Sequence, residues 1–204
     1  MVKLFNVEDS VMLLIDHQRG TLGFCRNIPK KMIVQNARAL ARFAKALNMP
    51  IVLTSSQEQN AQGLLIDDIQ EILPEAYEAR IKRSGIANCW NDPEYKAAVL
   101  KAADGRKNLI IAGLTNDVCT CYPAVSMVDD GFNVLVVQDA GGSPNQLAED
   151  NARRFWERGG ARTITVNALA AELGNDWSSE NGGKMIGIVF EEIISQLDAM
   201  GKFD

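Results

Sequence analysis

Short runs of aliphatic and β-branched residues recur along the chain, each about as long as one buried β-strand. The four most pronounced runs lie at residues 11–15, 51–54, 109–112 and 134–137. Each is apolar on both faces, a pattern typical of strands that are covered on both sides in a parallel sheet. A weaker strand signal near residues 79–82 and a short β-branched segment at residues 163–166 predict a third and a sixth strand.

Helical periodicity fills most of the intervals between these runs. Residues 33–47 repeat apolar side chains at helical spacing, and Asp92 before a proline predicts the capped start of a helix over residues 93–103. Further helices are expected at residues 119–130, 145–158 and 64–69, the last within a long connection. The glycine pair at residues 182–183 predicts a break, followed by a closing amphipathic helix over residues 186–197.

This alternation of strands and helices predicts an α/β fold with a doubly wound, six-stranded, mainly parallel sheet and helices on both faces, in a Rossmann-like three-layer arrangement. We expect one domain over residues 1–204, with a core at about 11–173 and with 174–204 forming a tail and helix that contact other subunits. Sheets of this kind bind ligands beyond the carboxyl ends of their strands. That edge is expected to carry Asp16, Lys82, Arg83 and residues 116–119.

The charge balance argues against broadly electrostatic partners. Lys and Arg number 21 against 26 Asp and Glu, so the net charge of −5 offers no general attraction to phosphate backbones or anionic lipid. The sequence shows neither a secretory signal at residues 1–10 nor a transmembrane run. Its four cysteines are therefore expected to be reduced thiols in the cytoplasm. We expect a small-molecule substrate, with no nucleic acid and no membrane among the partners.

Cys119 is the best candidate nucleophile. It lies in the run AGLTNDVCTC at residues 112–121, where an apolar strand passes through a polar turn into a predicted helix. A thiol at a helix amino terminus has its thiolate stabilised by free amides, which can lower its pKa, and the same amides can hold an oxyanion. The alternative is a small apolar side chain that fills the seam between helix and sheet. Cys121 lies on another side of the helix and fits that structural role.

Ionisable groups at two other strand ends complete a possible site. Asp16 ends the run VMLLID, so its carboxylate is expected at the end of a buried strand, where it either caps the next turn or takes part in catalysis. Lys82 and Arg83 are adjacent, so a strand sends them to opposite faces and only one can enter a pocket. The lone histidine, His17, argues against a zinc or iron site and against a serine hydrolase triad.

Together these residues resemble the isochorismatase-like cysteine hydrolase superfamily, and within it the branch of YcaC-type hydrolases. The matching elements are VMLLID with His17 and Gln18, the Lys82–Arg83 pair followed by NCW at 88–90, AGLTNDVC at 112–119, DDGFNV at 129–134, and Asp139 with Ala140. They cover the chain from about residue 11 to residue 173. Three separated elements in the right order make the resemblance specific.

The resemblance implies roles for the matching residues. Cys119 would be the nucleophile and Asp16 would accept its proton and later protonate the leaving amine. The third member of the triad would be Lys82 or Arg83, with Arg83 favoured by its spacing to the NCW element. A non-proline cis peptide between Leu114 and Thr115 would lie before the nucleophile and, with the amide of Cys119, serve the oxyanion. The expected substrate-binding residues are Gln18, Phe24, Asn88 and Trp90.

The resemblance also leaves alternatives open. Metal-binding nicotinamidases of the superfamily have histidines after the second strand, but residues 54–63 read TSSQEQNAQG, so we expect no metal and no cofactor. We expect hydrolysis of a small amide or related C–N substrate through a thioester. The alternatives are isochorismatase-type vinyl-ether cleavage without a cysteine nucleophile, a catalytically silent binding or scaffold protein, and a thiol redox role. The resemblance implies a homo-oligomer, from a dimer up to an octamer, to which Trp177 and the closing helix could contribute.

Overall fold

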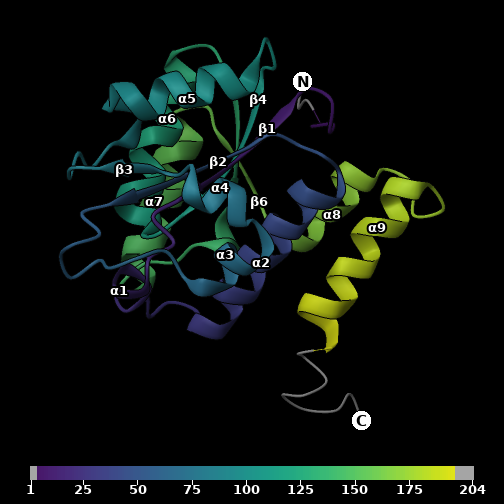
Figure 1. The fold of residues 1–204 in the computed structure, drawn as a ribbon, viewed down its shortest axis with the longest axis horizontal. Coiled ribbons are helices and arrows are strands. Elements are labelled where there is room, and N and C mark those ends of the chain that lie inside the picture. Colours follow the sequence, from purple (N-terminus) through teal and green to yellow (C-terminus); the bar gives the residue numbers. More distant parts are fainter. Residues whose placement is uncertain (1–3, 196–204) are drawn as a thin grey trace.

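The computed structural model describes residues 4–195, which form a three-layer α/β structure around one six-stranded sheet (Figure 1). The strand order is β3-β2-β1-β4-β5-β6, and every neighbouring pair is parallel. The strands are β1 (Ser10–Ile15), β2 (Ile51–Ser56), β3 (Ile81–Arg83), β4 (Asn108–Gly113), β5 (Asn133–Val137) and β6 (Arg162–Ile164). The predicted fold class is confirmed.

Helices connect the strands and cover both faces of the sheet. The α-helices are α1 (Arg19–Leu22), α2 (Lys30–Ala46), α3 (Asp67–Ile72), α4 (Pro74–Glu78), α5 (Pro93–Ala103), α6 (Cys121–Asp129), α7 (Gln146–Arg158), α8 (Val166–Gly174) and α9 (Glu180–Val189). Short 3₁₀ turns lie at η1 (Cys89–Asn91) and η3 (Gln138–Ala140), and π-helical turns at η2 (Asn116–Thr120) and η4 (Phe190–Ile194). No helix in the described part of the chain is long and apolar enough to span a membrane.

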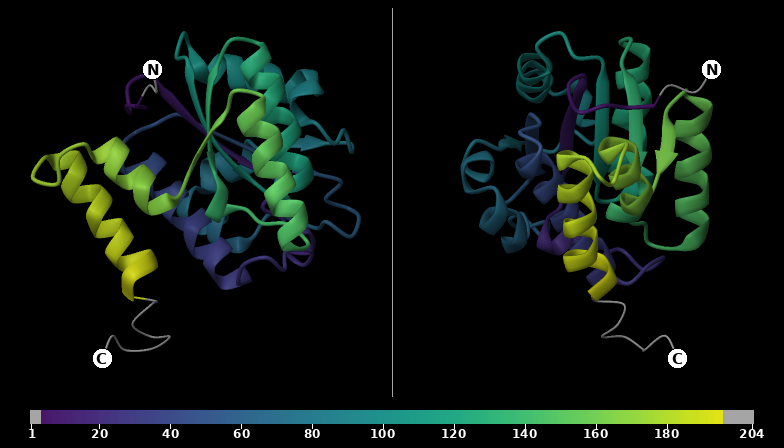
Figure 2. Two further views of the ribbon diagram at one scale, coloured as in Figure 1. Left: turned by 180° about the vertical axis from the view of Figure 1, so that it is seen from behind. Right: turned by 90° about the vertical axis from the view of Figure 1, so that its right-hand side faces the viewer.

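The alternation of side chains along β1 divides the core into two layers. Met12 and Leu14 pack into one layer with residues of α2, α8 and α9, whereas Val11, Leu13 and Ile15 pack into the other with residues of α5, α6 and α7. Figure 2 shows these two helix groups on opposite sides of the sheet. Both faces of β1 are therefore buried, which explains why its residues 11–15 are all apolar.

Three element boundaries differ from the sequence predictions. The third strand covers Ile81–Arg83, so it includes the arginine, and the sixth strand ends at Ile164. Thr165 then caps α8, because its side chain accepts a hydrogen bond from the amide of Ala168. The long connection from Gln57 to Arg80 contains two short helices, α3 and α4. The helix predicted at residues 64–69 overlaps only the first half of α3, and α4 was not predicted.

The predicted chain break at Gly182 and Gly183 is wrong. Both glycines lie in the first turn of α9, where the hydroxyl of Ser179 accepts a hydrogen bond from the amide of Gly182. A Cβ at position 182 would lie 1.9 Å from the carbonyl oxygen of Asp176, so glycine permits the close approach of the preceding loop. The closing helix therefore starts at Glu180 instead of residue 186, and its predicted end at Leu197 lies outside the described residues.

The topology fixes where a ligand site can form. The chain leaves β1 toward β2 on one side and leaves β4 toward β5 on the other, so the strand order reverses between β1 and β4. A crevice forms at such a point beyond the carboxyl ends of the strands. Asp16 follows β1 and the η2 turn, which carries Cys119, follows β4.

Candidate active site

Asp16 follows β1 in a buried and unusual backbone position. Its side chain is only 2% exposed, and its φ of 55° lies in the left-handed region that most residues avoid. The amide of Asp16 donates a 2.9 Å hydrogen bond to the carbonyl oxygen of Thr54, which holds this conformation against β2. Backbone conformations of this kind are concentrated at functional sites, and here the turn directs a carboxylate beyond the end of the sheet.

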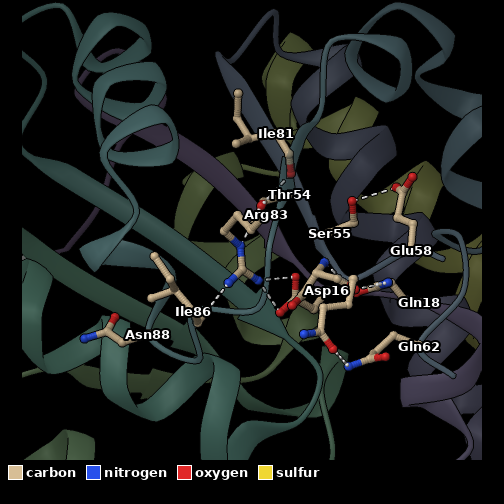
Figure 3. Close-up of polar contacts among 12 residues, drawn as sticks. Asp16, Gln18, Thr54, Ser55, Glu58, Gln62, Ile81, Arg83, Ile86 and Asn88 are labelled. Atoms are coloured by element: carbon tan, nitrogen blue, oxygen red, sulfur yellow. Dashed lines mark hydrogen bonds and ion pairs between the residues drawn. The ribbon is translucent and has the colours of Figure 1, made fainter. Parts of the chain in front are cut away.

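The guanidinium of Arg83 compensates the charge of Asp16 (Figure 3). Its Nη2 donates to both carboxylate oxygens, at 2.5 Å to Oδ1, and its Nη1 donates to the carbonyl oxygen of Ile86 at 2.5 Å. The Nε donates at 2.9 Å to the hydroxyl of Thr54, which in turn donates to the carbonyl oxygen of Ile81. The adjacent Lys82 is exposed, so of the two candidate cations the strand directs Arg83 to Asp16.

Cys119 is held in the π-helical turn η2 rather than at the start of an α-helix. The turn begins at Asn116, and α6 follows it from Cys121. Cys119 and Asp16 line one cavity, and Arg83 pairs with Asp16, so the fold brings together three residues that lie far apart in the sequence. Cys121 is buried, and its thiol donates to the carbonyl oxygen of Asp117 at 3.1 Å, consistent with the structural role predicted for it.

Burial controls the electrostatics of this group. Burial raises the pKa of the Asp16 carboxyl, and the charge and hydrogen bonds of Arg83 oppose that shift. Burial also raises the pKa of the Cys119 thiol, and the negative charge of Asp16 adds to the increase. The predicted lowering of the thiol pKa is therefore wrong, since desolvation and a neighbouring carboxylate outweigh the amides of a short turn. Both effects favour the neutral form of the Cys119 thiol in the free site.

A buried carboxylate on α7 anchors the turn that carries Cys119. Glu149 is 3% exposed and accepts from the Nδ2 of Asn116 at 2.9 Å. It also accepts from the Nε2 of Gln138 and from the hydroxyl of Ser143, each at 2.6 Å. The amide of Asn116 donates in addition to the carbonyl oxygen of Gly142 at 2.8 Å. The first residue of η2 is thereby fixed to the segments that follow β5.

A cavity of about 440 Å³ opens onto Asp16 and Cys119. Two predicted substrate-binding residues line it. Phe24 is 61% exposed at the cavity wall. Gln18 also lines the cavity, and its side chain is held by the backbone of Ser56: its Nε2 donates to the carbonyl oxygen at 2.8 Å, and its Oε1 accepts from the amide at 2.9 Å. Other wall residues that the sequence did not single out include Thr21, Gln62 and Asp117.

The structure does not bring Asn88 and Trp90 to this cavity. The side chain of Asn88 donates to the hydroxyl of Ser126 at 2.9 Å and caps the η1 turn by accepting from the amide of Trp90. Trp90 is buried against Phe132 with ring centroids 5.9 Å apart, and its indole N–H donates to Asp130 at 2.7 Å. Both residues therefore shape the packing between η1 and α6 in this chain, and their prediction as cavity residues is wrong for the described residues.

Two further predictions concern the nucleophile turn and metal ions. The peptide bond between Leu114 and Thr115 is cis, at the bond where the resemblance placed it. Thr115 and Cys119 line the cavity, whereas Leu114 is buried against Cys25 and Ile33. Within residues 4–195, no group of three or more His, Cys, Asp or Glu side chains is arranged to hold a metal ion.

Sequence and structure comparisons relate the chain to known proteins. The family model of the isochorismatase domain matches residues 10–168. The chain belongs to the isochorismatase family. Within this family it is 36% identical to the probable hydrolase YcaC of Escherichia coli (strain K12) over 175 residues, which cover 86% of this chain and 82% of the relative. The family resemblance derived from the sequence motifs is confirmed.

Two solved structures of family members show how far the likeness extends. The structure of YcaC from Pseudomonas aeruginosa, which contains hexane-2,5-diol and covalent acrylamide, superimposes with a TM-score of 0.89 at 31% identity, over 98% of this chain and 96% of that one. The YcaC gene product of Escherichia coli, described as an octameric hydrolase of unknown specificity, gives the same TM-score at 32% identity and the same coverage. This isochorismatase-family chain therefore shares nearly the whole fold of the YcaC structures.

Proposed function

We propose that this protein is a cysteine hydrolase that cleaves a small amide through a thioester on Cys119. The observation that carries the proposal is that the Cys119 thiol and the buried, Arg83-paired carboxylate of Asp16 line the same small-molecule-sized cavity. A neutral thiol needs a base at the moment of attack, and a carboxylate with a raised pKa is suited to receive its proton.

The proposed reaction has two halves. The sulfur of Cys119 attacks the amide carbon while its proton moves to Asp16, and the amides of Thr115 and Cys119 stabilise the oxyanion. Collapse breaks the C–N bond, and Asp16 gives its proton to the leaving amine. Water then attacks the thioester and gives a proton to Asp16, which returns it to the departing thiolate as the acid leaves. Arg83 stays charged and positions Asp16 throughout.

One relative supports the proposed chemistry, and another indicates how the chain assembles. The structure of Pseudomonas aeruginosa YcaC contains covalent acrylamide, which is itself a small primary amide and an electrophile that reacts with thiols. The Escherichia coli relative is octameric, so we infer that this chain also assembles as a homo-oligomer. Trp177 and Phe190, which are 47% and 54% exposed near the carboxyl end of the described chain, are available for such contacts.

Ammonia release from a panel of small primary amides tests the proposed function. The intact protein is expected to release ammonia with at least one member, and the variants Cys119→Ala and Asp16→Asn are expected to lose that activity by at least about 10³-fold. Retention of activity in Cys119→Ala with loss in Asp16→Asn would contradict the thioester route and would favour the vinyl-ether chemistry that needs only an acid.

A further inference from the structure

The wall of the active-site cavity contains a carboxylate without a partner. Asp117 lines the cavity two residues before Cys119, and its Oδ1 is buried with no hydrogen-bond partner. The carboxylate of Asp117 forms no ion pair with any residue in the described range 4–195. Asp16 lines the same cavity, but Arg83 compensates its charge. The cavity wall therefore holds one carboxyl group that forms no ion pair with a described residue.

The remaining wall offers nothing that would neutralise Asp117. Among the described residues, the lining includes no lysine, arginine or histidine. The amide of Gln18 is occupied by backbone partners, and the other nearby wall residues include the apolar Phe24 and Pro144. Thr21 also lines the cavity, and its hydroxyl oxygen is buried and has no hydrogen-bond partner. Two buried oxygen atoms in one wall thus lack hydrogen bonds.

An unpaired buried oxygen costs free energy until a ligand satisfies it. Asp117 can only accept hydrogen bonds when ionised, and Thr21 can accept one as well. A ligand that brings N–H donors and a positive charge satisfies both groups. A ligand that brings a carboxylate places like charges together in a small, partly desolvated space, where repulsion is strong.

We propose that the substrate is a small amide that carries a cationic amino group, with the ammonium bound by Asp117 and Thr21 and the amide carbonyl at Cys119. The apolar chain between the two groups lies along Phe24 and Pro144. This inference rests on the proposed function and adds the substrate class. It disfavours acidic substrates, including dicarboxylates of the isochorismate type, which would face Asp117 without a matching cation.

Three amides of nearly equal length separate charge from shape: 5-aminopentanamide is cationic, hexanamide is neutral, and the monoamide of adipic acid is anionic. Their binding is measured by calorimetry at low ionic strength on the full-length Cys119→Ala variant, in which no turnover occurs. The cationic amide is expected to bind at least about 10-fold more tightly than the neutral one, as a charge-assisted hydrogen bond provides, and the anionic amide should bind most weakly.

Single substitutions test whether the preference for the cationic amide comes from Asp117 and Thr21. Asp117→Asn is expected to reduce the cationic preference to less than about 3-fold, and Thr21→Val to weaken binding of the cationic amide alone. Asp129→Asn removes the same charge from an exposed position on α6 that does not line the cavity, and should leave the preference intact. If the neutral or anionic amide binds as tightly as the cationic one, or if none binds, the inference is overturned.

Ammonia release by the wild-type protein with the same three amides keeps this inference separate from the proposed function. A cationic preference in binding without ammonia release would support the ligand class and contradict the hydrolase mechanism. Release from all three amides at similar kcat/KM would support the mechanism and overturn the ligand class.

Discussion

Arg83 contacts Asp16 across an intervening strand. The arginine ends β3 and the aspartate follows β1, so the guanidinium passes over β2, where the hydroxyl of Thr54 accepts a hydrogen bond from its Nε. The register that pairs Ser56 with Arg83 sets this reach. The carboxylate proposed as the base of the reaction thus depends on a contact that spans three strands.

Substitution of Arg83 should affect stability and activity far more than substitution of its neighbour Lys82. Arg83→Met leaves the buried carboxylate of Asp16 unpaired, so we expect the free energy of unfolding to fall by about 3 kcal/mol. Arg83→Lys keeps the charge but cannot reproduce the fork that contacts Asp16, Thr54 and Ile86, so ammonia release should fall by at least about 10-fold. Lys82→Met, at the exposed neighbour, should change stability by less than about 0.5 kcal/mol. Urea unfolding and kinetics check these values, and equal effects at the two positions would refute the assignment.

Glu149 should act as a positioning residue for the nucleophile turn. Its carboxylate receives donors from Asn116, Gln138 and Ser143, so Glu149→Gln places an amide N–H₂ against donors. We expect a loss of about 1 to 3 kcal/mol in unfolding free energy and slower alkylation of Cys119 in the folded protein. Asp150→Asn, one residue further along α7, is the control and should leave both quantities unchanged. Normal Cys119 alkylation in a destabilised Glu149→Gln protein would show a purely structural role.

His17 should remain neutral well below its usual titration range. Burial lowers its pKa from 6.5 to about 4, although its Nε2 is hydrogen-bonded to the carbonyl oxygen of Ala140. Because the folded pKa lies below the unfolded one, this group contributes stability above pH 6.5 that is lost as the pH falls toward 4. As the sequence contains one histidine, NMR can follow its ring alone. The ring resonances should stay constant from pH 8 to about 5, and a midpoint near 6.5 would contradict the buried environment.

The sequence predicted those features that local patterns determine. Runs that are apolar on both faces identified four strands of the sheet, β1, β2, β4 and β5. Asp16 and Cys119, which follow two of these strands, share one cavity. The family motifs located the cis peptide bond at Leu114 and Thr115. The single-domain boundaries and the cytoplasmic location stay predictions.

Long-range packing determined what the sequence could not predict. The choice between Lys82 and Arg83 depended on the third strand, which ends at Arg83, one residue later than the sequence predicted. Burial of Glu149 follows from the packing of an otherwise polar helix, so no local pattern marks it. Asp117 lies within the nucleophile motif, two residues before Cys119, so its position alone could have marked it as a cavity residue. Trp90 was misplaced because its motif gives its neighbours in sequence, whereas its contact with Phe132 depends on tertiary structure.

The rate of Cys119 alkylation in the wild-type protein and in Asp16→Asn tests the central claim most directly. Peptide mass spectrometry after limited iodoacetamide treatment at neutral pH distinguishes Cys119, which lines the cavity, from the buried Cys25, Cys89 and Cys121. If Asp16 accepts the thiol proton during attack, labelling is confined to Cys119 and slows by about 10²-fold in Asp16→Asn. Loss of the negative charge alone would lower the thiol pKa and speed labelling. Unchanged or faster labelling in Asp16→Asn would therefore contradict the proposed base.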